Sequence, residues 1–262
     1  MLSRFSRLTR PQALTLCALP VVGLLAVALF APLPFTVAQP GLTANVLGEN
    51  RGTPVITISG APTHDTTGQL RMTTIEATGP DARVSLGDVL DGWFDTDRAV
   101  MPRDAVYPRG DDLREIEQYN REQMEESQDA ATTAALDHLD LSAADVDVTL
   151  RLADVGGPSA GLLFSLGIID KLDTGDLTGG RVVAGTGTIT PDGEVGAVGG
   201  VPLKTQAAHR DGATVFLVPR AECADAEAEL PEGMRLIPVE TLTGAVDALT
   251  ALETGRGTVP AC

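Results

Sequence analysis

The sequence predicts a mixed α/β domain preceded by one N-terminal transmembrane helix. An apolar run at residues 13–38 is long enough to cross a bilayer as a helix. From residue 145 onwards, segments of alternating hydrophobicity succeed segments of helical periodicity, as in α/β proteins. We therefore expect five parts: a cytoplasmic N-terminus 1–12, a transmembrane anchor 13–38, a linker 39–52, a folded domain 53–255 and a tail 256–262.

The composition supports a buried core and argues against nucleic-acid binding. Hydrophobic residues make up 43% of the 262 residues and charged residues 21%, which is typical of a globular domain. The net charge is −17, so a phosphate backbone would be repelled. Lysine is rare, because only Lys171 and Lys204 occur among 19 basic residues. A buried lysine can lose its proton, whereas an arginine cannot.

Charges beside the apolar run predict the orientation of the anchor. Arg4, Arg7 and Arg10 precede the run, and positive charge keeps that end of a transmembrane helix in the cytoplasm. The domain is then expected outside the cytoplasm, in the cell envelope. The alternative is a signal peptide with a small-residue cleavage site at 36–38. We favour the uncleaved anchor, because signal peptides have an apolar core of only roughly 7–15 residues.

The cysteines agree with an oxidising compartment. Cys17 lies inside the predicted anchor, which leaves Cys223 and Cys262 in the rest of the chain. Outside the cytoplasm these two can form a disulfide that ties the tail to the domain. Two free thiols are the other interpretation.

The first half of the domain is expected to hold few elements. Residues 40–60 are interpreted as a tether leading into a strand at 54–58. Alternating hydrophobicity predicts a strand at 69–77, and helical periodicity predicts a short helix at 84–94 and a long one at 111–141.

The second half alternates strands and helices. A turn at 191–193, Pro-Asp-Gly, predicts a hairpin between the strands on either side of it. The strands are expected at 145–152, 181–190, 194–198, 214–219 and 234–238, and the helices at 159–172, 201–210 and 242–252.

Ser159 is the candidate nucleophile. It follows two glycines and a proline and is expected on the first turn of the helix 159–172. Backbone N–H groups at a helix start are unpaired, so they can bind a developing oxyanion. A serine hydroxyl still needs a base to become a good nucleophile.

Lys204 is the candidate base. It projects from the first turns of the otherwise apolar helix 201–210, where burial would lower its pKa and make the neutral amine available. An exposed surface lysine is the alternative interpretation. The three histidines, His64, His138 and His209, lie in a turn or on helices, where a solvated histidine is the usual case.

These residues resemble the motifs of the Lon proteases. Residues 157–161 read Gly-Pro-Ser-Ala-Gly, like the nucleophile motif of that family, and Gly199-Gly200 with Lys204 resembles its lysine motif. The stretch 184–189, Ala-Gly-Thr-Gly-Thr-Ile, matches the family's order between the two motifs. The resemblance is strong over residues 145–252 and weak over 50–141.

The resemblance implies a Lon proteolytic-domain fold and a serine endopeptidase with a Ser159–Lys204 dyad. Thr186 falls where the family has a threonine that hydrogen-bonds the lysine, and backbone near Gly157 and Ala160 would support the site. It also implies protein or peptide substrates, a homo-oligomer that is hexameric, and no metal or cofactor.

The sequence departs from its nearest family pattern in three ways. Membrane-anchored bacterial Lon-like proteases usually carry a PDZ domain, but only residues 142–145 separate the long helix from the next strand. The Gly-x-x-x-x-Gly-Lys-[Ser/Thr] motif of an ATPase is absent, which predicts ATP-independent activity. Gly156 replaces the family's acidic residue three before the serine, with Asp154 displaced nearby.

Two other functions fit parts of the sequence. Residues 157–161 also satisfy Gly-x-Ser-x-Gly, so an α/β-hydrolase esterase with His209 as its base is one alternative. A catalytically silent Lon-like binding or scaffold module is the other.

Overall fold

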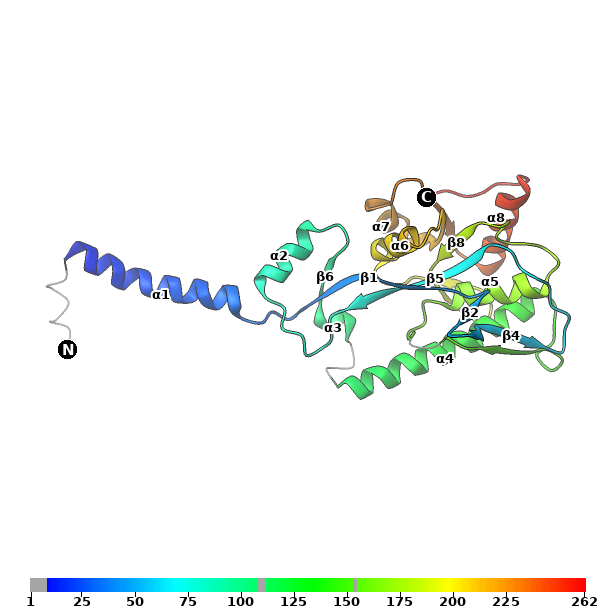
Figure 1. Ribbon diagram of the computed structural model, residues 1–262, viewed down its shortest axis with the longest axis horizontal. Coiled ribbons are helices and arrows are strands. Elements are labelled where there is room, and N and C mark those ends of the chain that lie inside the picture. The colour runs from blue at the N-terminus through cyan, green and yellow to red at the C-terminus, as the bar shows by residue number, and fades with distance from the viewer. Residues whose placement is uncertain (1–8, 108–111, 153–154) are drawn as a thin grey trace.

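The computed structural model describes residues 9–107, 112–152 and 155–262. Helix α1 (Arg10–Phe30) extends away from the body of the protein, as Figure 1 shows. An 18-residue window of this helix, Arg10–Val27, is apolar enough to cross a membrane. None of this window is buried inside the protein. Thr9 is the N-cap of α1, and Pro11 lies in its first turn, where proline is favoured. The helix therefore begins just before the predicted apolar run.

A six-stranded mixed sheet forms the centre of the body. Its order is β12-β11-β8-β5-β1-β6, with β5, β8, β11 and β12 parallel to one another and β1 antiparallel to both of its neighbours. The predicted mixed α/β class is therefore confirmed. The strands are β1 (Phe35–Asn45), β5 (Gln69–Ala77), β6 (Ala99–Pro102), β8 (Val182–Gly185), β11 (Val215–Pro219) and β12 (Arg235–Val239).

Strand β1 corrects the expected tether. Residues 35–38, which the sequence assigns to the end of the anchor, and residues 39–45, which it assigns to a linker, together form a strand next to the edge strand β6. Pro40 and Gly41 read as breakers in the sequence, but they lie where the pairing of β1 with β5 shifts register. A bulge tolerates both residue types, since the ladder is already interrupted there.

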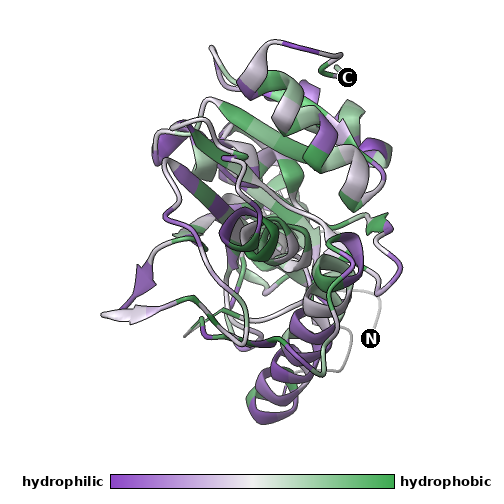
Figure 2. Cartoon of the chain, turned by 90° about the vertical axis from the view of Figure 1, so that its right-hand side faces the viewer, coloured by the Kyte–Doolittle hydropathy of each residue, from purple (hydrophilic) through white to green (hydrophobic). Residues whose placement is uncertain are grey.

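Helices cover both faces of the sheet, which gives two separate hydrophobic cores. Alternate residues of the strands point to opposite faces, so Leu217 joins one core and Phe216 the other. Helices α4 and α5 pack together on the first face with α8, and α6 and α7 cover the second. Figure 2 shows hydrophobic strands in the centre and a hydrophilic exposed length of α4. These helices are α4 (Leu113–His138), α5 (Gly161–Leu172), α6 (Val201–Arg210), α7 (Cys223–Ala228) and α8 (Leu242–Thr254).

The remaining elements are short. The predicted hairpin is confirmed, because β9 (Thr188–Ile189) and β10 (Val195–Gly196) pair antiparallel around the turn at 191–193. Between β5 and α4 lie α2, β6 and α3, beside the end of α1 in Figure 1. The others are β2 (Glu49–Asn50), β3 (Thr53–Pro54), β4 (Ile56–Ser59), α2 (Leu86–Phe94), α3 (Arg103–Val106), β7 (Asp147–Leu150) and the 3₁₀ helix η2 (Arg220–Glu222).

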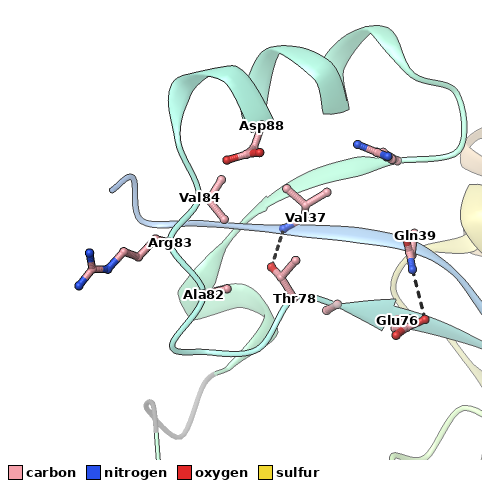
Figure 3. Close-up of a pocket in the computed structure, with 10 residues that line it drawn as sticks. Val37, Gln39, Glu76, Thr78, Ala82, Arg83, Val84 and Asp88 are labelled. Carbon is pink, nitrogen blue, oxygen red and sulfur yellow. Dashed lines mark hydrogen bonds between the residues drawn. The ribbon is translucent and has the colours of Figure 1, made fainter. Parts of the chain in front are cut away.

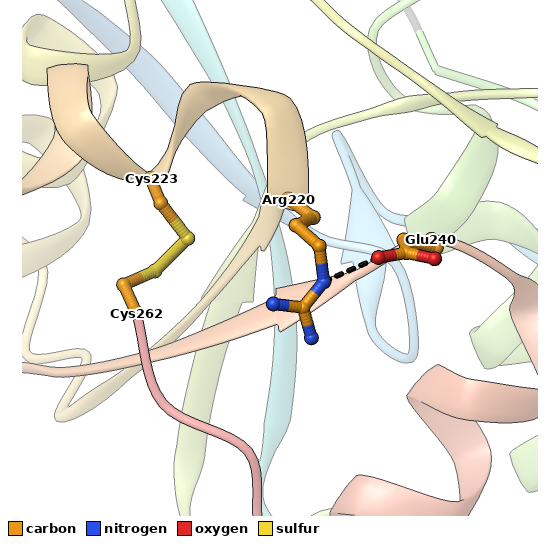
Figure 4. The surroundings of a disulfide bond; sticks show 4 residues. All are labelled: Arg220, Cys223, Glu240 and Cys262. Atoms are coloured by element: carbon orange, nitrogen blue, oxygen red, sulfur yellow. Dashed lines mark ion pairs between the residues drawn. A yellow bond between two sulfur atoms is a disulfide. The ribbon is translucent and has the colours of Figure 1, made fainter.

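A disulfide joins Cys223 and Cys262, with their Cα atoms 5.5 Å apart. It ties the tail to the start of α7, as Figure 4 shows, and an ion pair between Arg220 and Glu240 lies beside it. Of the two interpretations of these cysteines, the structure therefore has the disulfide. Cys17 is a free, exposed thiol on α1.

Candidate active site

Ser159 lies in a turn that precedes helix α5. The sequence predicts it on the first helical turn, but α5 begins at Gly161 and its N-cap is Ala160. The helix starts later because tertiary contacts hold the turn: the N–H of Leu162 donates to the carbonyl oxygen of Gly187, 3.2 Å away, rather than within the helix. The N–H groups of Ser159 and Ala160 have no acceptor among the residues that the structure describes.

Helix α4 holds one side of this turn. The hydroxyl of Ser127 donates to the carbonyl oxygen of Pro158 at 3.0 Å, and the N–H of Gly157 donates to the carbonyl oxygen of Asn120 at 3.1 Å. Gly157 has a φ of +87°, a conformation that an L side chain rarely adopts. The glycine and the helix together thus set the path of the chain into Ser159.

The segment after β8 holds the other side. The carbonyl oxygen of Ser159 accepts hydrogen bonds from the N–H of Gly187 at 3.1 Å and from the hydroxyl of Thr186 at 3.3 Å. These bonds use the carbonyl oxygen of Ser159 and leave the N–H groups of Ser159 and Ala160 without an acceptor among the described residues. This arrangement suits the stabilisation of an oxyanion.

Lys204 is buried on α6, with 3% of its surface exposed. Its Nζ donates a hydrogen bond to Thr186 Oγ1 at 3.0 Å. Burial lowers the pKa of Lys204 from 10.5 to about 8, and the negative charge of Glu222 opposes this shift. The neutral amine is therefore easier to reach near neutral pH than in an exposed lysine. The alternative of an exposed surface lysine is therefore wrong.

Gly200 places α6 against the sheet. It is the N-cap of α6 and has a φ of +72°, in the left-handed region that favours glycine. A Cβ atom at this position would lie 2.9 Å from Ile75 Cγ2 on β5. The close approach at Gly200 lets the first turn of α6, and with it Lys204, lie next to the sheet.

Ser159 and Lys204 line one cavity of about 380 Å³. Thr186 connects them, since it binds both the amine of Lys204 and the backbone of Ser159. No direct hydrogen bond joins the two side chains among the described residues. A separate hollow of about 310 Å³, shown in Figure 3, lies beside β1 and α2 and contains none of the predicted site residues.

The histidines lie outside this cavity. His209 is exposed near the end of α6, and His138 contacts Thr243 through its ring Nδ1 at 3.3 Å. The backbone N–H of His64 donates a hydrogen bond to the carbonyl oxygen of Lys171. No histidine is placed to act as a base for Ser159, which removes the basis of the α/β-hydrolase alternative.

Three positioning residues were not found from the sequence. Ser127 interrupts the alanine stripe of α4 on its buried face, a signal that could have been noticed. Asn120 acts through its backbone, which leaves no trace in the sequence. Glu222 is brought near Lys204 by η2, and burial raises its pKa although its carboxylate accepts a bond from the N–H of Val198 at 3.0 Å. Asp154 lies outside the described residues.

No group of three histidine, cysteine or acidic side chains is close enough to hold a metal ion in the part of the chain that the structure describes. What the cavity offers instead is the hydroxyl of Ser159 and the amine of Lys204. A sequence profile of the Lon protease (S16) C-terminal proteolytic domain matches residues 116–251, just over half of the chain. The chain belongs to this family.

Individual Lon proteases are similar over a shorter stretch. The Lon protease of Clostridioides difficile is 44% identical over 79 residues, which is 30% of this chain and 10% of that protein. The Lon protease of Chloroflexus aggregans is 39% identical over 89 residues (32% and 10%), and Lon protease 1 of Myxococcus xanthus 34% over 100 residues (37% and 12%). The chain thus spans about a tenth of the length of these relatives. Within that tenth, it is a Lon-like proteolytic domain.

Proposed function

We propose that this protein is a serine endopeptidase in which Ser159 is the nucleophile and Lys204 the general base. The observation that carries the proposal is the environment of Lys204. The amine is buried, is bound to Thr186 and opens onto the same cavity as Ser159. Burial of an amine costs stability, and an amine with a lowered pKa is what a serine hydroxyl needs as its base.

The mechanism uses groups already in place. Neutral Lys204 takes the proton from Ser159 Oγ as that oxygen attacks the carbonyl carbon of a peptide bond. The N–H groups of Ser159 and Ala160 hold the resulting oxyanion. Protonated Lys204 then delivers its proton to the leaving amine, and an ester joins Ser159 to the acyl part of the substrate. A water molecule, deprotonated by Lys204, hydrolyses this ester and restores the enzyme.

Thr186 is assigned a positioning role in this mechanism. Its oxygen accepts a hydrogen bond from Lys204 Nζ, and its hydroxyl hydrogen is directed to the carbonyl oxygen of Ser159. This polarity leaves the lone pair of a neutral Lys204 free for the proton of Ser159. Gly157 contributes by its backbone, since its conformation sets the turn.

The scaffold alternative explains less of the geometry. A binding module gains nothing from a buried amine whose only described hydrogen-bond partner is a threonine beside a serine turn. An apolar side chain would fill the same volume without the cost of burying a charge. We therefore prefer a working peptidase whose substrates are proteins or peptides. We also propose that it is ATP-independent and forms a homo-oligomer, hexameric as the family resemblance implies.

We propose a single-pass membrane protein with the N-terminus in the cytoplasm and the catalytic domain in the cell envelope. Helix α1 supplies the span, and the Cys223–Cys262 disulfide suits an oxidising compartment. Helix α2 contacts α1 and exposes Trp93 (71%) and Phe94 (86%). Aromatic side chains of this kind are enriched at membrane interfaces.

The site at 36–38 does not suit cleavage of a signal peptide. Thr36 and Ala38 are buried, and residues 35–38 are the strand partners of β6. Cleavage after Ala38 would remove from the sheet the part of β1 that pairs with β6. This supports an uncleaved anchor.

The test is labelling of the full-length protein in detergent with a fluorophosphonate probe, which reacts with activated serines. We expect labelling of the wild type and none of Ser159→Ala or Lys204→Arg, because arginine keeps the charge but cannot accept a proton at neutral pH. Lys171→Arg is a matched control, since Lys171 is the only other lysine and should keep full labelling.

Each other outcome has a definite meaning. Labelling that survives Lys204→Arg would show that a different base activates Ser159. A folded wild type that neither labels nor cleaves casein would favour the scaffold module. Thermal unfolding of each variant verifies that loss of labelling is not loss of the fold.

A further inference from the structure

Part of the cavity wall comes from a segment outside the family match. Met101 on β6 and Ala105 and Val106 on α3 line the same cavity as Ser159 and Lys204. The family profile begins at residue 116, after this segment. The family domain by itself therefore leaves this side of the cavity undefined, and residues 99–106 complete it.

The wall is fixed by the chain that immediately follows α1. Strand β6 is the edge strand of the sheet and pairs with β1, where Met101 lies opposite Thr36. The N–H of Arg103 donates to the carbonyl oxygen of Pro34 at 3.1 Å, at the start of α3. The hydroxyl of Tyr107 donates to the carbonyl oxygen of Thr78 at 2.7 Å, just after its end. Contacts at both ends thus hold α3 in place.

Most of the residues that line the cavity are apolar or glycine. Ile75 and Val198 line it together with Met101 and Val106. Lys204 is the only charged residue among the described residues that line it. A charged substrate side chain of either sign would lose its hydration here, which costs free energy. An acidic side chain would in addition pair with Lys204 and favour its protonated form, whereas the general base must be neutral.

We infer that residues Met101, Ala105 and Val106 form a specificity wall that selects substrates with an uncharged, apolar side chain next to the scissile bond. The inference rests on the proposed peptidase function and adds to it a substrate class and residues that determine specificity. These residues take no part in the chemistry. Their side chains set the size of the space that the substrate side chain fills.

Two substitutions change the size of this space in opposite directions. Met101→Ala should enlarge it and Val106→Phe should reduce it, while Asp104→Ala, on the exposed side of α3, is the matched control. The substrates are internally quenched peptides in which each position from three before to three after the scissile bond is varied through Ala, Val, Leu, Phe, Asp and Lys. The enzyme is the full-length protein in detergent.

For the wild type we expect cleavage of peptides with an apolar residue at one position and poor cleavage with Asp or Lys there. At that position, Met101→Ala should raise kcat/KM for Phe relative to Ala by about tenfold, and Val106→Phe should lower the same ratio by about tenfold. Asp104→Ala should leave it unchanged. Opposite changes could not arise from a general loss of stability.

Labelling by the fluorophosphonate probe separates the two levels of the proposal. If the variants label like the wild type and the Phe-to-Ala ratio does not move in either, the specificity wall is wrong and the peptidase function stands. A wild type that prefers Asp or Lys would also overturn the wall. If the wild type fails to label at all, the proposed function falls and the inference falls with it.

Discussion

The family-matching segment 116–251 buries a charged side chain, whereas the segment before it, 10–107, exposes large apolar ones. Lys204 is 3% exposed in a domain of net negative charge, while Trp93 and Phe94 stand out from α2 although aromatic residues make up only 3% of the chain. Both arrangements cost free energy in water. We therefore propose proton transfer for segment 116–251 and contact at a lipid interface for segment 10–107.

The two segments are nevertheless one structural unit. Strand β1, which follows α1, pairs with β5 in the middle of the sheet, and β5 pairs with β8 of the family segment. Met101 and Val106, from segment 10–107, line the same cavity as Ser159 and Lys204 of segment 116–251. A protein that begins at residue 41 would lack half of β1, so experiments require the whole chain. The following predictions test the contrast between the segments.

The largest effect is expected at the buried amine. Lys204→Met should abolish labelling by the probe and yet stabilise the fold at pH 7. A pKa lowered from 10.5 to about 8 corresponds to a cost on the order of 3 kcal/mol for holding the charged amine. That cost applies in full below pH 8 and disappears as the pH rises from 8 to 10.5, because the unfolded chain then still binds the proton that the folded state has lost.

Thermal unfolding of the wild type and Lys204→Met at pH 7 and pH 10 measures this difference. The gap between them should be large at pH 7 and smaller at pH 10, and Lys171→Met should show no such gap at either pH. A Lys204→Met variant that is less stable than the wild type at both pH values would refute the assigned cost of burial.

A smaller loss is expected when the positioning threonine is replaced. Thr186→Val should lower kcat for peptide cleavage about tenfold to a hundredfold, because the amine loses its hydrogen-bond partner at 3.0 Å and is no longer oriented. KM should change little. Thr205→Val is the control: Thr205 is also buried on α6, but its hydroxyl donates to the carbonyl oxygen of Pro202 and, among the described residues, has no bond to Lys204. Equal losses in the two variants would mean that Thr186 is merely structural.

The pH dependence tests the surroundings of the amine. The rate of probe labelling should rise with pH around 8 as Lys204 loses its proton. Glu222→Gln should shift this rise to lower pH, because the carboxylate of Glu222 raises the pKa of Lys204. Glutamine keeps an oxygen for the N–H of Val198. Glu227→Gln, on the exposed side of α7, should leave the profile in place, and a shift to higher pH in Glu222→Gln would contradict the assignment.

The smallest effect concerns the exposed aromatic residues of α2. Trp93 is the only tryptophan, so the fluorescence of the full-length protein reports on that residue alone. In liposomes of phosphatidylcholine, brominated acyl chains should quench its emission, because α2 contacts the end of α1. Strong quenching by aqueous acrylamide with none by brominated lipid would place Trp93 in water. Phe94→Ser should weaken the lipid quenching.

Local patterns in the sequence were enough to predict several elements and candidate residues. Alternation predicted β5 at 69–77 with its observed bounds, and helical periodicity did the same for α6 at 201–210. Both depend on one buried face, which leaves a periodic signal in the sequence. The paired motifs at 157–161 and 199–204 likewise singled out Ser159 and Lys204 as residues of one site.

Only the tertiary structure decided which of these residues lie in contact with one another. Strand β1 escaped prediction because its partners lie far away in the chain and its Pro40-Gly41 pair resembles a loop. Burial of Lys204, its bond to Thr186, the charge of Glu222 and the disulfide all join segments that only the packing of the sheet brings together. The sequence by itself thus determined the local elements and the reactive groups. Their pKa values and contacts depend on distances that no local pattern contains.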